Sequence, residues 1–77
     1  MVGAIVQRVK LHIETEVETD GRWIAEIPEI AGAMAYGATR EDAMKAAQVL
    51  ALRILSDRLE HGEAVPEDIS HLTFEAA

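Results

Sequence analysis

The sequence predicts a single α+β domain with three antiparallel strands, one long helix and a short fourth strand, in the order β-β-β-α-β. Three observations support this prediction. Apolar and polar residues alternate up to an Asp20-Gly21 pair, a short apolar run then stops at Pro28, and an apolar-rich segment lies between Thr39 and Gly62. With 77 residues, the chain is expected to form one domain that spans residues 1–77.

The first predicted strand occupies residues 5–18. A period of two places one set of residues on a buried face and the intervening residues on the opposite face. The buried set is Ile5, Val9, Leu11, Ile13, Thr15 and Val17, and the opposite set is Lys10, His12, Glu14, Glu16 and Glu18. Glu14, Glu16 and Glu18 therefore form an acidic row, which is either a solvated face or a docking strip for a basic partner. Carboxylates spaced in this way along one strand do not converge on one metal ion.

The Asp20-Gly21 pair predicts a hairpin turn, because glycine tolerates positive φ angles and aspartate can bond its own backbone. The second strand begins at Trp23 and ends at Pro28, since proline cannot donate to a ladder. A third strand is predicted over residues 33–36, and the short links between these strands favour an antiparallel meander. Trp23 is interpreted as a core anchor paired across the hairpin, or alternatively as an interface hot spot.

Thr39 predicts the N-cap of a helix that ends near Glu60, with Gly62 as its C-terminal stop. The helix is apolar over about half of its circumference or more, whereas a helix that covers one small sheet needs a stripe of roughly 100°. An overhanging sheet or tail would hide the excess. The alternative, which we favour, is a second buried face in a homo-oligomer, a dimer or a tetramer. The predicted interface residues are Leu52, Leu55 and Leu59.

The chain is acidic, with a net charge of -7 and a pI near 4.7. This balance argues against a nucleic-acid-binding surface and suits a basic partner. Past Arg58 the chain carries acids and no base, and a last strand is predicted over residues 69–74. The absence of cysteine excludes disulfides and cysteine-based zinc sites. No apolar run approaches the roughly 20 residues of a transmembrane helix, and a cytoplasmic location is expected.

The sequence contains no group of residues that predicts catalysis. Its glycines lack the spacing of a phosphate loop, and no HExxH motif is present. His12, His61 and His71 fall in three different predicted elements, which is typical of surface histidines. Asp20 and Glu26 lie on one hairpin and are the only acids we considered for a residual metal-dependent nuclease, but their spacing is not convergent. We therefore expect a protein that is not an enzyme and that binds no metal or cofactor.

A longer pattern joins these features in a fixed order. It consists of Asp20-Gly21-Arg22-Trp23-Ile24-Ala25, Ile27-Pro28-Glu29-Ile30, Gly32, Gly37, Thr39, Glu41, Asp42-Ala43, Ala47 and Gly62-Glu63-Ala64-Val65-Pro66. In order and spacing, this pattern resembles the HicB antitoxin family over residues 9–70. The family often has Pro-Gly-Cys in the middle turn, where this chain has Ala31-Gly32-Ala33.

The resemblance implies a partial ribonuclease-H-like fold and an antitoxin that binds HicA, a small basic toxin that cleaves messenger RNA, and covers its catalytic surface. Many family members carry a C-terminal DNA-binding module, for which this chain has no room, so no direct binding of nucleic acid is expected. The residues predicted to contact the partner are Glu14, Glu16, Glu18, Asp20, Arg22 and Trp23. The alternative is a short stand-alone member of the family, an oligomer of unknown ligand without a toxin partner.

Overall fold

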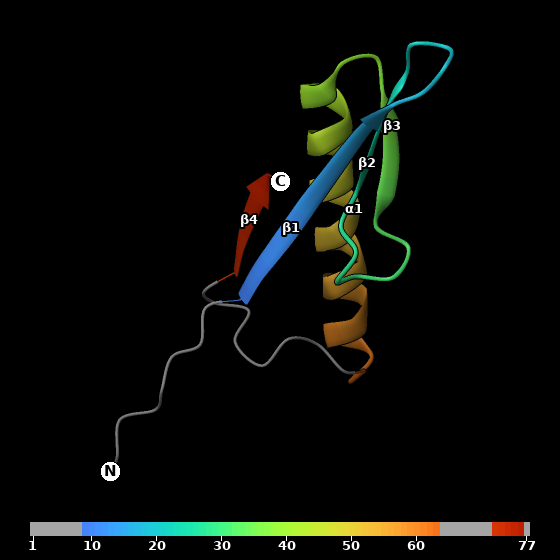
Figure 1. Ribbon diagram of the computed structural model, residues 1–77. Helices are drawn as coiled ribbons and strands as arrows, with labels where there is room; N and C mark the ends of the chain where they lie inside the picture. The colour runs from blue at the N-terminus through green and yellow to red at the C-terminus, as the bar shows by residue number, and fades with distance from the viewer. Residues whose placement is uncertain (1–8, 64–71, 77) are drawn as a thin grey trace.

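The computed structural model describes residues 9–63 and 72–76, and it has the α+β architecture and the element order that the sequence predicts. The elements are β1 (Val9–Val17), β2 (Trp23–Glu26), β3 (Met34–Gly37), α1 (Arg40–Glu60) and β4 (Leu72–Ala76) (Figure 1). The predicted start of the first strand, at residues 5–8, and the predicted start of the last strand, at residues 69–71, lie outside the described residues.

The four strands form one mixed sheet in the order β3-β2-β1-β4. The predicted antiparallel meander is confirmed for the first three strands, since β1 pairs with β2 and β2 with β3 in antiparallel fashion. β4 instead runs parallel to β1, so the sheet as a whole is not antiparallel. Parallel neighbours need a long crossover, and α1 lies between β3 and β4 along the chain and supplies it.

The β1–β2 hairpin turns at the predicted Asp-Gly pair. Gly21 has φ +88°, and its amide donates to the carbonyl of Glu18 at 2.9 Å. The Asp20 carboxylate accepts from the backbone amide of Arg22 at 3.1 Å and from its Nε at 2.7 Å. The turn is therefore stabilised from both sides of the glycine. It begins directly after Val17, the last residue of β1, so Glu18 belongs to the turn and not to the predicted acidic row of the strand.

The caps of α1 confirm both predicted helix ends. The Thr39 hydroxyl accepts from the amide of Asp42 at 3.1 Å, which satisfies one of the free amides of the first turn. At the other end Gly62 has φ +68°, and the amides of Gly62 and Glu63 donate back to carbonyls of the last helical turn. Both capping signals depend on a few neighbouring residues, so they could be recognised from the sequence alone.

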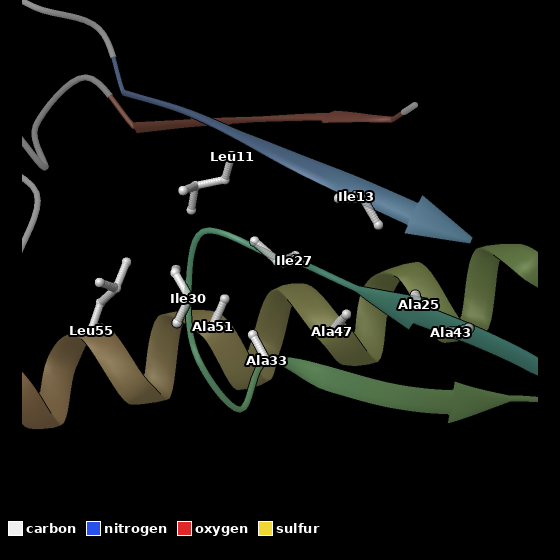
Figure 2. Packing of buried hydrophobic residues seen from close by; sticks show 10 residues of the cluster. All are labelled: Leu11, Ile13, Ala25, Ile27, Ile30, Ala33, Ala43, Ala47, Ala51 and Leu55. Carbon is white, nitrogen blue, oxygen red and sulfur yellow. The ribbon is translucent and has the colours of Figure 1, made fainter. Parts of the chain in front are cut away.

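A line of small residues joins α1 to the sheet. Ala43, Ala47 and Ala51 are fully buried and face the strands, with Leu55 continuing the line (Figure 2). The sheet and its loops complete the buried core with Leu11, Ile13, Ala25, Ile27, Ile30 and Ala33. Alanine side chains let the helix axis approach the sheet closely, and this proximity is what leaves no room for a side chain at Gly37.

Two burial predictions are wrong. Leu55 is only 5% exposed and lies in the chain's own core, so it is not available as an interface residue. The reason is the rotation of the helix, which turns the alanine line and Leu55 toward the sheet. Val17 was expected on the buried face but is 53% exposed, because it is the last residue of β1, next to the hairpin turn, and does not pack against the core cluster.

Candidate partner-binding surface

α1 covers one face of the sheet, and the described chain leaves the opposite face uncovered (Figure 1). Two cross-strand rows define what we call the outer face. The first row joins Glu16 on β1, Ile24 on β2 and Tyr36 on β3. The second row joins Glu14, Glu26 and Met34 in the same strand order. Each row therefore has an acidic end on β1 and an apolar end on the edge strand β3.

The carboxylates of the outer face are concentrated and uncompensated. Glu14 lies directly opposite Glu26, and both line a shallow depression of about 240 Å³ together with Glu16, Thr15 and Ile24. All three glutamates are exposed, and within the described part of the chain no lysine, arginine or histidine nitrogen lies within 4.0 Å of their oxygens. Like charges placed directly across a sheet are destabilising, so this face retains an electrostatic cost in the isolated chain.

Exposed apolar side chains lie beside these acids. Met34 and Tyr36 on β3 are 47% and 46% exposed, although both belong to a regular strand. The guanidinium of Arg22 lies 4.6 Å from the centroid of the Tyr36 ring, which is a cation–π distance. The outer face therefore combines an acidic half on β1 and β2 with an apolar half on β2 and β3.

The guanidinium of Arg22 does not neutralise the glutamates, because it is paired with the carboxylate of Asp20. The backbone amide of Arg22, followed by its side chain, holds the pKa of the Asp20 carboxyl below its usual value. This pair lies at the hairpin turn, at one end of the outer face. Asp20 is thus a structural residue of the turn, and its charge is already matched.

The other end of the same face carries paired charges. His12 donates its backbone amide to one oxygen of Glu29 at 3.1 Å, and its Nδ1 lies 2.5 Å from the other oxygen. Partial burial alone would raise the pKa of Glu29, but these hydrogen bonds outweigh it and hold the pKa below its usual value. Lys10 lies 3.6 Å from Glu75 of the neighbouring β4. On the outer face of the described chain, the unmatched negative charge is therefore confined to the β1–β2 region.

The structure divides the predicted partner-binding residues into three groups. Glu14 and Glu16 lie on the outer face. Glu18, Asp20 and Arg22 belong to the hairpin turn. Trp23 lies on the helix side, where it is partly buried and packs against the core cluster, which matches its interpretation as a core anchor.

This surface also contains four residues that were not predicted from the sequence: Ile24, Glu26, Met34 and Tyr36. The position of Glu26 on this surface could have been predicted from the sequence. Once the hairpin is centred on the Asp-Gly turn, the antiparallel register places Glu26 opposite Glu14. Met34 and Tyr36 carried no such signal, because an apolar residue of a short strand is expected to be buried.

A different cluster gathers at the C-terminal end of α1. The ligand atoms of Asp57, His61 and Glu63 lie within 4.8 Å of one another, and all three residues are exposed. His61 Nδ1 lies 2.8 Å from the carbonyl oxygen of Asp57 and 3.3 Å from its carboxylate. The helix cap and these interactions account for the grouping, and we assign no metal to it.

Comparisons with protein-family models, with curated proteins and with solved structures found no match to this chain. Among the described residues, α1 is the single helix, and it is not apolar enough to cross a membrane.

Proposed function

We propose that this chain is a non-enzymatic protein-binding module that acts as a HicB-like antitoxin. Its partner is a small basic toxin of the HicA type, which the module binds and occludes through the outer face. The observation that carries this proposal is the group of three unpaired carboxylates, Glu14, Glu16 and Glu26, beside the exposed Met34 and Tyr36. A messenger-RNA-cleaving partner also implies a cytoplasmic location.

The charge pattern supports a basic partner over a neutral one. Lysine or arginine side chains placed against Glu14 and Glu26 would relieve the repulsion between these opposed carboxylates. The net charge of -7 would accelerate the encounter through long-range attraction, and this effect would weaken as salt is added.

The apolar half of the outer face supports a specific contact. Interfaces are enriched in tyrosine and methionine, and their centres lose water on binding. Tyr36 and Met34 lie next to the acids on the adjoining strands, so one partner surface can meet both halves. The shallow depression between the glutamates has the form of a docking surface and lacks the depth of a substrate pocket.

The proposal requires that a small basic protein be encoded beside this chain, and co-expression with that protein tests it. Size-exclusion chromatography should show a complex, and co-expression should restore the growth that the basic protein alone arrests. The double variant Glu16→Gln/Glu26→Gln should weaken binding by at least about tenfold, because it removes two of the three unpaired charges.

The matched control is Glu41→Gln/Glu63→Gln, which changes the net charge equally but lies away from the outer face, in the first turn of α1 and three residues past its end. This control should bind within about threefold of the unsubstituted chain. Equal losses in both variants would show that net charge, and not the outer face, controls binding. Absence of any complex and of growth rescue would overturn the antitoxin proposal and favour the stand-alone module.

A further inference from the structure

The side of α1 that faces away from the sheet carries an apolar ridge. Val49, Leu52 and Leu59 are 43%, 49% and 54% exposed, and Ser56 lies between them. Together with Lys45, these three apolar residues and Ser56 follow one another along α1 at spacings of four, three, four and three positions. Such spacing keeps side chains on one side of a helix. The buried alanine line occupies the opposite side, so the core does not explain the ridge.

Shallow grooves run along both flanks of this ridge. One groove, of about 460 Å³, is lined by Val49, Leu52, Arg53, Ser56, Asp57 and Glu60. The other, of about 230 Å³, is lined by Leu52, Leu55, Ser56, Leu59 and Leu72. A ridge with a groove beside it is the surface that a second helix needs, because helices pack by placing the ridge of one into the groove of the other.

The charges along the ridge are unmatched within the described chain. Lys45 and Arg53 are exposed, and no carboxylate among the described residues lies within 4.0 Å of either. Glu60 is the last residue of α1 and Glu63 follows it by three residues, so both lie far from Lys45 along the helix axis. Glu41 lies one turn before Lys45 and adds an exposed acid beyond it, so Lys45 is the cation toward the N-terminal end of the ridge and Glu60 lies beside its C-terminal end.

We infer that α1 pairs along this ridge with α1 of a second copy of the chain, antiparallel and related by a two-fold axis that passes between Leu52 and Ser56 of the ridge. This arrangement places Val49 against Leu59 of the second copy and Leu52 against its Ser56. It also places Lys45 beside Glu60 of the second copy. A parallel pair would instead bring Lys45 against Lys45 and Glu60 against Glu60, so the charge pattern selects the antiparallel pair.

This inference does not depend on the proposed toxin partner. The ridge and the outer face lie on opposite sides of the two-layer domain, with the sheet and the body of α1 between them (Figure 1). A helix-to-helix pair leaves both outer faces exposed and directed away from each other. The assembly would therefore present two partner-binding surfaces.

Sedimentation equilibrium of the full chain is the first test. The chain should show a dimeric mass, and Leu52→Gln should raise the dimer dissociation constant by at least about tenfold. Met34→Gln is the matched control, because Met34 is exposed to nearly the same extent, 47% against 49%, but lies on the outer face. Circular dichroism of each variant would establish that the fold is retained. A monomeric mass up to about 1 mM, or dissociation by Met34→Gln instead, would overturn the inference.

Cysteine cross-linking tests the direction of the pair, since the chain contains no cysteine of its own. A mixture of Val49→Cys and Leu59→Cys chains should form a disulfide between the two variants on oxidation, whereas neither variant alone should link efficiently. Efficient linkage of Leu59→Cys to itself would indicate a parallel pair and would refute the antiparallel arrangement. A charge exchange gives a second readout: Lys45→Glu should weaken the dimer, and adding Glu60→Lys should restore it.

Discussion

The contact between β3 and the start of α1 leaves no room for the substitution Gly37→Ala. A Cβ atom at Gly37 would lie 2.4 Å from the amide nitrogen of Ala43, 2.8 Å from the carbonyl carbon of Asp42 and 2.9 Å from the Cα of Ala43. These are backbone atoms of the first helical turn, so no side-chain rotation can move them away. Restoring a tolerable contact requires β3 and the start of α1 to separate by about 1 Å.

The expected cost follows from that displacement. Overpacking one methyl group in a well-packed core typically costs about 1–3 kcal/mol, and a clash with backbone belongs at the upper end of that range. The separation would also loosen the contacts of Ala43 and Ala47, both of which are fully buried. We expect a loss of about 3 kcal/mol in the free energy of unfolding. For a domain of this size, such a loss lowers the thermal midpoint by at least about 10 °C.

Urea denaturation followed by circular dichroism measures this loss, and Gly21→Ala is its control. Gly21 has φ +88°, and a Cβ there would meet no atom within 4 Å, so its substitution isolates backbone strain. That strain is about 1–2 kcal/mol for alanine. If Gly37→Ala costs less than about 0.5 kcal/mol, or less than Gly21→Ala, then α1 does not approach β3 as closely as these distances require.

Three further outcomes are expected. Thr39→Ala should lower the free energy of unfolding by about 1 kcal/mol in urea denaturation, because it removes the hydroxyl that accepts from the Asp42 amide, whereas Thr39→Ser should retain most of it. Ala51→Leu should cost about 1–3 kcal/mol and lower the thermal midpoint, because Ala51 is fully buried against the sheet. The His12–Glu29 pair should stabilise the fold above the ordinary carboxyl pKa of 4.5, and this stabilisation should disappear as pH falls through the depressed folded-state pKa of Glu29. Denaturation at a series of pH values should therefore show a steeper acid loss in the unsubstituted chain than in Glu29→Gln, by under about 1 kcal/mol because the pair is partly exposed.

The features that the sequence predicted correctly are all set by neighbouring residues. The hairpin at Gly21, the N-cap at Thr39 and the stop at Gly62 each depend on a few consecutive positions. The period of two along β1 likewise identifies Leu11 and Ile13, which are both only 1% exposed. Local geometry suffices for these features, since caps and turns satisfy their own backbone groups.

The features that the sequence did not predict depend on contacts between distant segments. The side of α1 that meets the sheet is marked by alanines, which give a weaker hydrophobic signal than the leucines on the ridge. Leucine content therefore favoured Leu52, Leu55 and Leu59 as one group, although Leu55 faces the core and the other two face outward. The parallel position of β4 next to β1 also has no local signature, because it is set by the path of the chain after α1.

The distribution of charge assigns different partners to the two exposed surfaces of this domain. Two outer faces packed with their acidic halves together would bring the carboxylates of Glu14, Glu16 and Glu26 against the same three groups, which is strongly repulsive. The helix ridge carries Lys45 toward one end and Glu60 beside the other, so it is complementary to itself in the antiparallel direction.

The two contacts should therefore differ in their response to salt. Raising it from about 0.05 to about 0.5 M should weaken binding of a basic partner severalfold or more, since that contact depends on unpaired carboxylates. The same change should leave the helix pair nearly unaltered, because its apolar contacts are not screened and its exposed ion pairs contribute little. Equal salt sensitivity of both contacts would contradict this division of the surface.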